Sequence, residues 1–349
     1  MDAIERPRAK GATRHGYYHD WPGFGIDASG AVAVRKTLRR PQVLPFFARL
    51  SPCLVGMEAC GTSHHWAREI MKLGHQVRLM PPAYVKPYVK RGKTDANDAE
   101  AICEAVTRPT MRFVAAKSRE QQAALALHRT RELLVKERTQ LVNMIRGLLA
   151  EFGIDIPRGL ERALAVARQI AEDGIVDVPD EARAALLELS RQALAAHERL
   201  RSIDRAMLAS HRASDLAVRL ATIPGIGPIG ASALAASVAD PLQFRSGREF
   251  AAWLGLTPLQ HSSGGKERQG RISKMGDRYL RKLLIVGMTS LVRRAKYKPQ
   301  SVDPYLVGLL TRKPARVATV AMANKAARIA WAIMARGGTY RAPVSRLAA

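Results

Sequence analysis

CLVGMEACGTSHHWAREIMKLGHQVRLM, residues 53–80, decides the fold class of the N-terminal half of the chain. Its first five residues are a short apolar run typical of a buried strand. Residues 61–73 have a helical apolar period, and QVRLM at 76–80 predicts a second strand. A strand, a helix and a strand at this spacing form a βαβ unit, so we expect an α/β domain with a parallel sheet.

Carboxylates lie where that sheet would bind a ligand. Glu58 ends the first strand, and the carboxyl ends of strands bind ligands in open α/β sheets. Downstream, Thr94 is a suitable cap for a helix that places Asp95 and Asp98 on one face. Carboxylates and phosphate oxygens are the ligands that Mg²⁺ prefers, so Glu58, Asp95 and Asp98 are the candidate metal ligands. The alternative is that all three are acids at helix entries, favoured there by the helix dipole.

The middle of the chain is helical. Residues 118–152 and 181–220 are both amphipathic and predict two long helices, an antiparallel pair or coiled coil. Neither carries a catalytic cluster, so we expect a role in spacing or self-association.

A glycine pair follows at Gly225 and Gly227, ahead of a helix of small residues. In helix-hairpin-helix elements, backbone amides at such a turn bind a DNA phosphate. A tight turn that packs helices together explains the glycines equally well.

Residues 257–281, TPLQHSSGGKERQGRISKMGDRYLR, contain adjacent serines, Ser262 and Ser263, before two glycines. A hydroxyl on a glycine-hinged loop among cations is suited to attack a phosphodiester, because cations offset the charge that grows on the phosphoryl oxygens. The alternative is a basic hairpin that only grips a phosphate backbone. The basic candidates for DNA contact are Lys266, Arg268, Arg271 and Lys274.

Composition points to the same class of partner. The 349 residues predict two or three domains, and their net charge of +26 predicts a polyanionic partner such as nucleic acid. No apolar run reaches the roughly 18 residues of a membrane-spanning helix, and the N-terminus lacks a secretory signal. Three cysteines without a CxxC pair predict reduced thiols in the cytoplasm and no zinc site.

Four motifs together resemble the DEDD-type insertion-sequence transposases of the group numbered one-hundred-and-ten, which includes the Piv invertase. The motifs lie in the family's order at residues 54–58, 93–99, 223–227 and 255–277. The resemblance implies an RNase H-like (RuvC-like) N-terminal domain whose four acids bind Mg²⁺, a helical coiled-coil linker and a mostly α C-terminal domain with a serine nucleophile. By match, Glu58 is the second acid, Asp95 the third, Asp98 the fourth, and Ser263 rather than Ser262 the nucleophile.

The resemblance also implies a mechanism and partners. DNA would be cleaved through a covalent phosphoserine link, in a site assembled across the protomers of a dimer or tetramer and guided by a structured RNA. The domain boundaries that we expect are a loose arm at 1–24, a RuvC-like domain at 25–115, a helical linker at 116–221, a serine domain at 222–336 and a disordered tail at 337–349.

The chain departs from the family pattern at the first acid. That acid belongs on an opening strand about a dozen residues before the turn that Asp27 occupies, and counting back reaches Arg14, His15 and Gly16. Asp20 comes too late. We therefore expect a replaced or frame-shifted start and impaired cleavage. The alternative functions are a RuvC-type Holliday-junction nuclease, which needs no serine, and a non-catalytic DNA-binding remnant.

Overall fold

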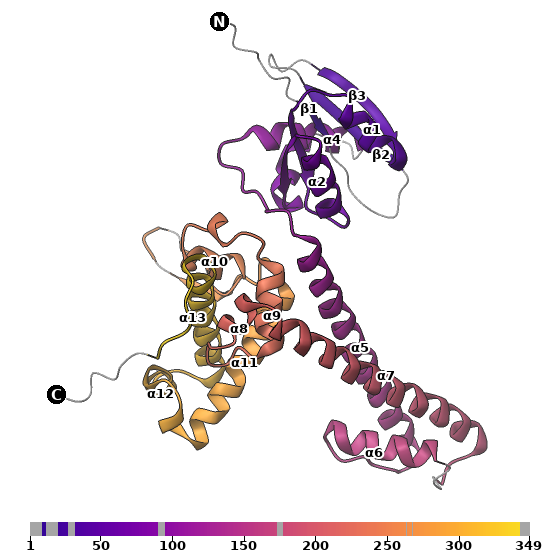
Figure 1. The fold of residues 1–349 in the computed structure, drawn as a ribbon. Helices are drawn as coiled ribbons and strands as arrows, with labels where there is room; N and C mark the ends of the chain where they lie inside the picture. Colours follow the sequence, from indigo (N-terminus) through magenta and orange to yellow (C-terminus); the bar gives the residue numbers. More distant parts are fainter. Residues whose placement is uncertain are drawn as a thin grey trace, which may run out of the picture. The chain divides into compact units, whose positions relative to one another are not determined.

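The computed structural model describes residues 9–11, 20–26, 32–89, 95–172, 177–262, 264–266 and 268–342. The chain divides into two compact units, residues 1–119 with 238–243, and residues 120–237 with 244–349 (Figure 1). The boundary predicted at 221/222 therefore falls inside the second unit. No helix in the described ranges is long and apolar enough to cross a membrane.

The first unit contains the predicted parallel pair. Strands β4 (Leu54–Glu58) and β5 (Gln76–Met80) pair in parallel, and α2 (Ser63–Lys72) connects them. The prediction of a βαβ unit is confirmed. Three further strands form an antiparallel sheet in the order β1 (Ala9–Gly11), β2 (Asp20–Ile26) and β3 (Val32–Arg39), with β1 beside β4.

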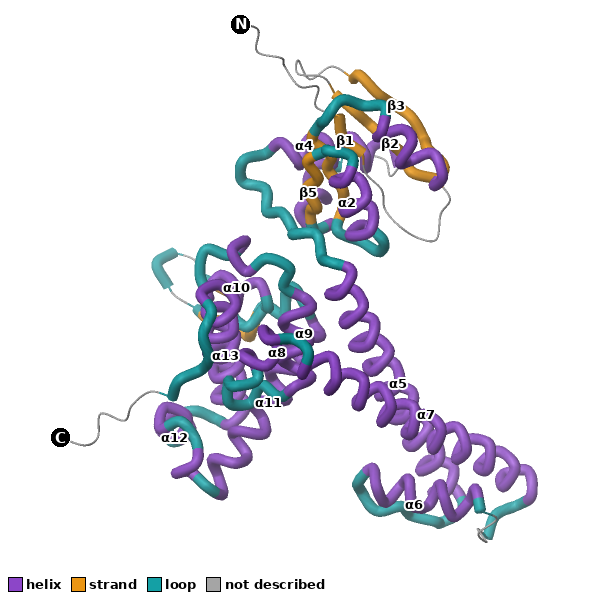
Figure 2. Tube along the Cα trace, in the orientation of Figure 1, coloured by secondary structure: helices purple, strands orange, loops and turns teal. Residues whose placement is uncertain are grey.

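Helices cover both faces of the parallel pair. Successive side chains of a strand point to opposite faces, so the apolar residues of these strands are buried on both sides. Val55 and Leu79 are buried in a core with α2, whereas Met80 is buried in a core with α4 (Asp95–Thr107). Figure 2 shows these helices against the strands. The remaining helices of the unit are η1 (Arg40–Gln42), α1 (Val43–Ala48), α3 (Pro82–Val85), η2 (Lys86–Tyr88) and η3 (Pro241–Gln243).

The expected loose arm needs correction. Residues 9–11 form β1 and β2 begins at Asp20, so part of residues 1–24 belongs to a sheet. The sequence of β2, DWPGFGI, contains a proline and two glycines and no apolar alternation, so it gave no strand signal. This strand forms by backbone pairing with β3, which runs from Asp20 opposite Arg39 to Ile26 opposite Val32.

The helical region of the second unit contains three helices. Helices α5 (Arg119–Glu151) and α7 (Asp180–Arg212) have 33 residues each, and α6 (Leu160–Ala171), which was not predicted, shares a buried core with both. Arg131 of α5 pairs with Asp204 of α7 at 2.6 Å, and Arg138 contacts His197 at 3.1 Å, so α5 and α7 run antiparallel. The coiled coil itself remains a prediction.

The rest of this unit is built around α13 (Ala315–Arg336), whose buried alanines allow neighbouring helices to pack closely. Tyr340, in the expected disordered tail, donates a backbone hydrogen bond of 2.9 Å to Thr222 Oγ1, so residues up to 342 do not fit that expectation. The other elements are α8 (Asp215–Leu220), α9 (Pro228–Ser237), α10 (Gly247–Trp253), β6 (Pro258–Gln260), β7 (Gln269–Ile272), α11 (Arg278–Tyr297), η4 (Pro299–Ser301) and α12 (Pro304–Leu310).

Candidate functional site

Glu58 lies at the carboxyl edge of the parallel pair, opposite Met80 in the β4–β5 register, and is half-buried. The chain turns immediately after it, where the Ala59 N–H donates to the Met80 carbonyl at 2.7 Å and the Cys60 N–H to the Glu58 carbonyl at 2.9 Å. These bonds hold Glu58 at the end of its strand, as the sequence predicts.

Helix α4 carries the two aspartates and packs against β4 at a glycine. A Cβ at Gly56 would lie 2.9 Å from Val106 Cβ and 3.2 Å from Ile102 Cγ2, so only glycine permits this approach. Asp98 is half-buried and lies one helical turn before Ile102, on the same side of α4. The side chain of Asp95 lies outside the described residues.

The described residues include no group of three or more His, Cys, Asp or Glu that could hold a metal. Because the side chain of Asp95 is not among them, convergence of Glu58, Asp95 and Asp98 stays a prediction. Arg14, His15, Gly16 and Asp27 also lie outside the described residues.

The serine loop connects β6 and β7, which pair in antiparallel fashion. Ser262 is exposed, and its Oγ donates to Gln260 Oε1 and accepts from the Arg268 N–H, both at 3.2 Å. Ser263 lies outside the described residues. Gly264 and Gly265 have φ of +55° and +76°, conformations that favour glycine, so the predicted glycine turn is confirmed.

The base of this hairpin is fixed tightly to α10 and α11. Gly255 and Gly276 both have φ of +69°, and a Cβ at Gly276 would lie 1.8 Å from the Trp253 carbonyl oxygen. Arg281 is buried, and its Nη1 donates to the carbonyls of Leu254 at 2.8 Å and Met275 at 2.7 Å. The segments before and after the hairpin are therefore joined through one guanidinium.

Two further contacts position α11, the helix that follows the hairpin. Asp277 caps it by accepting from the N–H groups of Tyr279 and Leu280. The buried His128 of α5 contacts the Tyr279 hydroxyl at 3.0 Å and Ser232 Oγ at 3.2 Å. Burial lowers the pKa of His128 to about 4 and raises the pKa of Tyr279 to about 12, so both are neutral at pH 7.

All four basic residues predicted to contact DNA, Lys266, Arg268, Arg271 and Lys274, are exposed. Among the residues that the structure describes, none of the four has an ion-pair partner. Their charges are therefore available to a polyanion, and contact with DNA remains a prediction.

The two glycines of the helix-hairpin-helix candidate differ. Gly225 has φ of +84° and packs on α11, where a Cβ would lie 2.4 Å from Met288 Cε. A Cβ on Gly287 would in turn lie 1.9 Å from the Gly225 carbonyl oxygen. Helix packing thus explains Gly225 without DNA. Apart from its chain neighbours, no atom of the described residues lies within 4 Å of a Cβ built at Gly227, so packing among them does not explain that glycine.

Two family models match the chain. Residues 33–154 match a DEDD transposase model, and residues 217–303 match a model described as the transposase IS116/IS110/IS902 family. The first match includes Glu58, Asp95 and Asp98, and the second includes the glycine pair and the serine hairpin.

Whole-chain relatives carry matching names. The chain is 50% identical to a probable family 20 transposase of Pseudomonas aeruginosa, over 91% of this chain and 94% of that protein. It is 42% identical to the transposase for insertion sequence element IS1328 of Yersinia enterocolitica, over 89% of this chain and 92% of that protein. It is also 28% identical to the pilin gene-inverting protein of Moraxella bovis, over 66% of this chain and 64% of that protein.

Proposed function

Because this chain belongs to the IS116/IS110/IS902 family of DNA transposases, we propose that it cleaves and rejoins DNA with Ser263 as nucleophile and with Mg²⁺ on Glu58, Asp95 and Asp98. In the first step Ser263 Oγ bonds to phosphorus, the bond from phosphorus to one deoxyribose oxygen breaks, and that oxygen takes up the serine proton. In the second step a hydroxyl of another DNA strand attacks the phosphoserine, and Ser263 regains a proton. Strands are thus exchanged without net hydrolysis.

The hydrogen bonds of the neighbouring Ser262 support the choice of Ser263 as the nucleophile. Ser262 already uses its hydroxyl as donor to Gln260 and as acceptor from Arg268, so attack by Ser262 would break contacts that shape the loop. Ser263 directly precedes the two glycines with positive φ, whose backbones leave space for a phosphate. Arg271 and Lys274, both exposed, would offset charge on the phosphoryl oxygens.

The donor set fits Mg²⁺, because carboxylate oxygens are its preferred protein ligands. Glu58 lies two positions after Gly56 on β4. Asp98 lies four positions before Ile102 on α4, and Ile102 contacts Gly56. The backbone of each acid therefore lies within about 7 Å of that contact along its own element. A bound Mg²⁺ would polarise the scissile phosphate.

An RNase H-like fold for the N-terminal domain is supported by the strand arrangement. Three antiparallel strands, a neighbouring parallel pair and helices on both faces suit that fold. Besides its partner β5, strand β4 has β1 as a neighbour, and the β1 residues Ala9, Lys10 and Gly11 include no acid. The DEDD match also begins only at residue 33. Both observations support loss of the first acid, and we propose that cleavage by this copy is impaired.

The partners of the reaction are DNA and, from the resemblance alone, a structured guide RNA and further copies of this chain. The net charge of +26 supports nucleic-acid partners, and the three free cysteines fit the cytoplasm.

A covalent-adduct assay tests this function. The chain is incubated with labelled DNA from the element's ends, the matching RNA and Mg²⁺, and adducts are resolved on a denaturing gel. We expect little adduct from the intact chain and more once an opening strand with an aspartate replaces the first residues. Ser263→Ala should abolish the adduct and Ser262→Ala should retain it. Cleavage that survives Ser263→Ala would instead indicate a hydrolytic nuclease, and DNA binding without cleavage in the restored chain a remnant.

A further inference from the structure

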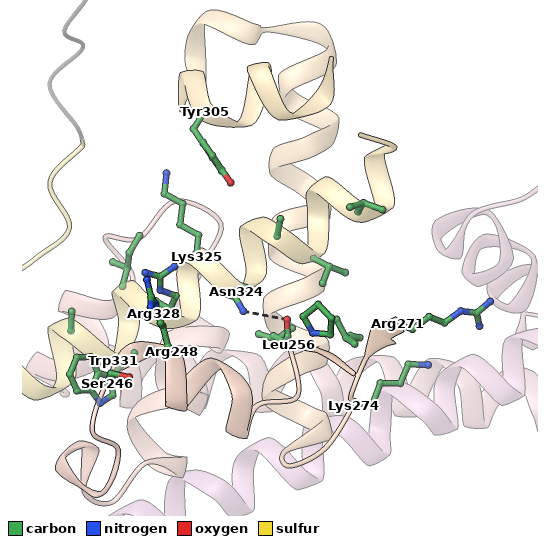
Figure 3. Close-up of a pocket in the computed structure, with 18 of the residues that line it drawn as sticks. Ser246, Arg248, Leu256, Arg271, Lys274, Tyr305, Asn324, Lys325, Arg328 and Trp331 are labelled. Carbon is green, nitrogen blue, oxygen red and sulfur yellow. Dashed lines mark hydrogen bonds between the residues drawn. The ribbon is translucent and has the colours of Figure 1, made fainter. Parts of the chain in front are cut away.

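A large open groove lies beside the serine hairpin, within the second unit. It has a volume of about 1490 Å³ and is walled by α10, α12, α13 and the base of β6–β7 (Figure 3). Small-molecule pockets span about 300–1,000 Å³, so this groove suits a polymer better than a metabolite. Asn324 Nδ2 donates to the Leu256 carbonyl at 3.3 Å and ties α13 to the hairpin base.

The groove is strongly basic. Seven cationic side chains and no acidic side chain appear among the described residues that line it. Only Lys325 has an ion-pair partner in the described ranges, Asp303 at 2.5 Å. The other six are Arg248, Arg271, Lys274, Arg316, Arg328 and Arg336. Figure 3 shows Arg248 and Arg328 close together at one end and Arg271 and Lys274 at the other.

An aromatic ring faces this basic surface. Tyr305 on α12 is 50% exposed, and Lys325 Nζ lies 4.6 Å from its ring centroid. Trp331, the other aromatic residue of the lining, is 9% exposed and has Arg336 over its ring at 5.6 Å, so it forms part of the wall. Tyr305 therefore provides the accessible stacking surface among the described lining residues.

From these observations we infer that the groove binds single-stranded DNA next to the cleaved phosphate. Cations that follow a backbone, together with an exposed aromatic side chain, form the typical binding surface for single strands, whose unpaired bases can stack. Bases inside a duplex offer no face to Tyr305. Arg271 and Lys274 belong both to the groove and to the serine hairpin, so a strand held at Ser263 would continue into the groove. The inference rests on the proposed function.

Binding of a labelled single strand tests it. The full chain with Ser263→Ala is titrated into a fluorescent oligodeoxythymidylate of about 12 nucleotides, a length typical of single-strand sites, and anisotropy is measured. We expect Tyr305→Leu to weaken binding roughly 5- to 150-fold, the effect of losing one stacked base, and Tyr305→Phe to bind normally. Arg248→Ala with Arg328→Ala should weaken binding more than the matched pair Arg191→Ala with Arg199→Ala, two exposed arginines of α7.

Three outcomes would overturn the inference: Tyr305→Leu binding as tightly as the parent, the groove pair behaving like the α7 pair, or Tyr305→Leu weakening duplex binding equally. If the chain binds oligouridylate more tightly than the DNA strand, and the groove variants lose oligouridylate binding, the groove would be a binding site for RNA instead. The nucleophile is tested separately by adduct formation. If the groove variants bind the single strand normally while the adduct still depends on Ser263, only the groove inference is rejected. If the groove variants lose single-strand binding while the adduct does not depend on Ser263, only the nucleophile is rejected.

Discussion

Arg281 Nη1 donates a 2.7 Å hydrogen bond to the carbonyl oxygen of Met275, six residues before it, and is buried while doing so. The same nitrogen bonds the Leu254 carbonyl, on the other side of the serine hairpin. A charged group inside the protein is costly unless it is hydrogen-bonded, so these bonds determine where the guanidinium lies. Arg281 thus positions both ends of the hairpin.

Arg281→Met should destabilise the protein and slow adduct formation more than it weakens DNA binding. Two carbonyls would lose a buried donor, which costs on the order of 2–5 kcal/mol of unfolding free energy. Urea unfolding measures the first effect, and adduct rates at saturating DNA measure the second. Arg278→Ala, an exposed arginine on the same helix, is the control. Equal stability of the two variants would show that Arg281 does not anchor the hairpin.

Stability should fall in mild acid because of His128. Its folded pKa, about 4, lies below the unfolded value near 6.5, so between these values only the unfolded chain takes up the proton. The stabilisation is therefore complete above pH 6.5 and is lost as the pH falls towards 4, by about 3 kcal/mol in total. His128→Gln should lose less stability than the parent between pH 7 and pH 5 in urea unfolding. Parallel pH profiles would contradict a neutral buried imidazole.

Alanine substitutions distinguish Gly225, which packs on α11, from Gly227, the candidate for contact with a DNA phosphate. Gly225→Ala should cost several kcal/mol, because the residue has positive φ and a Cβ there would meet Met288. Gly227→Ala should fold like the parent, since the added Cβ would meet no atom of the described residues within 4 Å beyond its chain neighbours. It should weaken duplex DNA binding a few-fold if its turn contacts a phosphate. Thermal unfolding and duplex anisotropy report the two effects. Normal DNA binding by Gly227→Ala would remove the helix-hairpin-helix role.

The local elements of this fold were predictable because their signals are local. The β4–α2–β5 unit follows from two apolar runs and one helical period, and the turn at Gly264–Gly265 follows from the glycines themselves. Helix α6 escaped prediction because its twelve residues are stabilised by contacts with α5 and α7 that are distant in sequence.

The features around the serine were less predictable. Arg281 is one of several basic residues in its segment, and only burial distinguishes it. The groove combines α10, the hairpin base, α12 and α13, and no sequence period connects Arg248 with Arg328 or Tyr305. Asp277 caps α11, but Ser273 is an equally suitable cap by residue type, so the sequence alone does not distinguish the two.

Mg²⁺ should stabilise the chain through the acids of the first unit. A ligand that binds only the folded state raises the unfolding temperature further as its concentration rises above its dissociation constant, so the readout does not depend on catalysis. We expect a Mg²⁺-dependent rise that Glu58→Gln and Asp98→Asn reduce and that restoration of an acidic opening strand enlarges. Glu104→Gln, on the same helix and paired with Arg108, should leave the rise unchanged. An equal rise in all variants would place the metal elsewhere.

Arg271→Ala and Lys274→Ala should slow adduct formation more than they weaken DNA binding. Both cations flank the serine loop, and an interaction that strengthens as charge develops on the phosphate contributes to rate rather than to ground-state affinity. Loss of one such donor lowers the rate by about 10²-fold in comparable sites, whereas loss of one phosphate contact weakens binding only a few-fold. Single-turnover adduct rates in the restored chain, measured at saturating DNA, separate these quantities. Lys266→Ala tests whether any cation of the loop suffices, and equal losses of rate and affinity in Arg271→Ala would assign that residue to the DNA backbone alone.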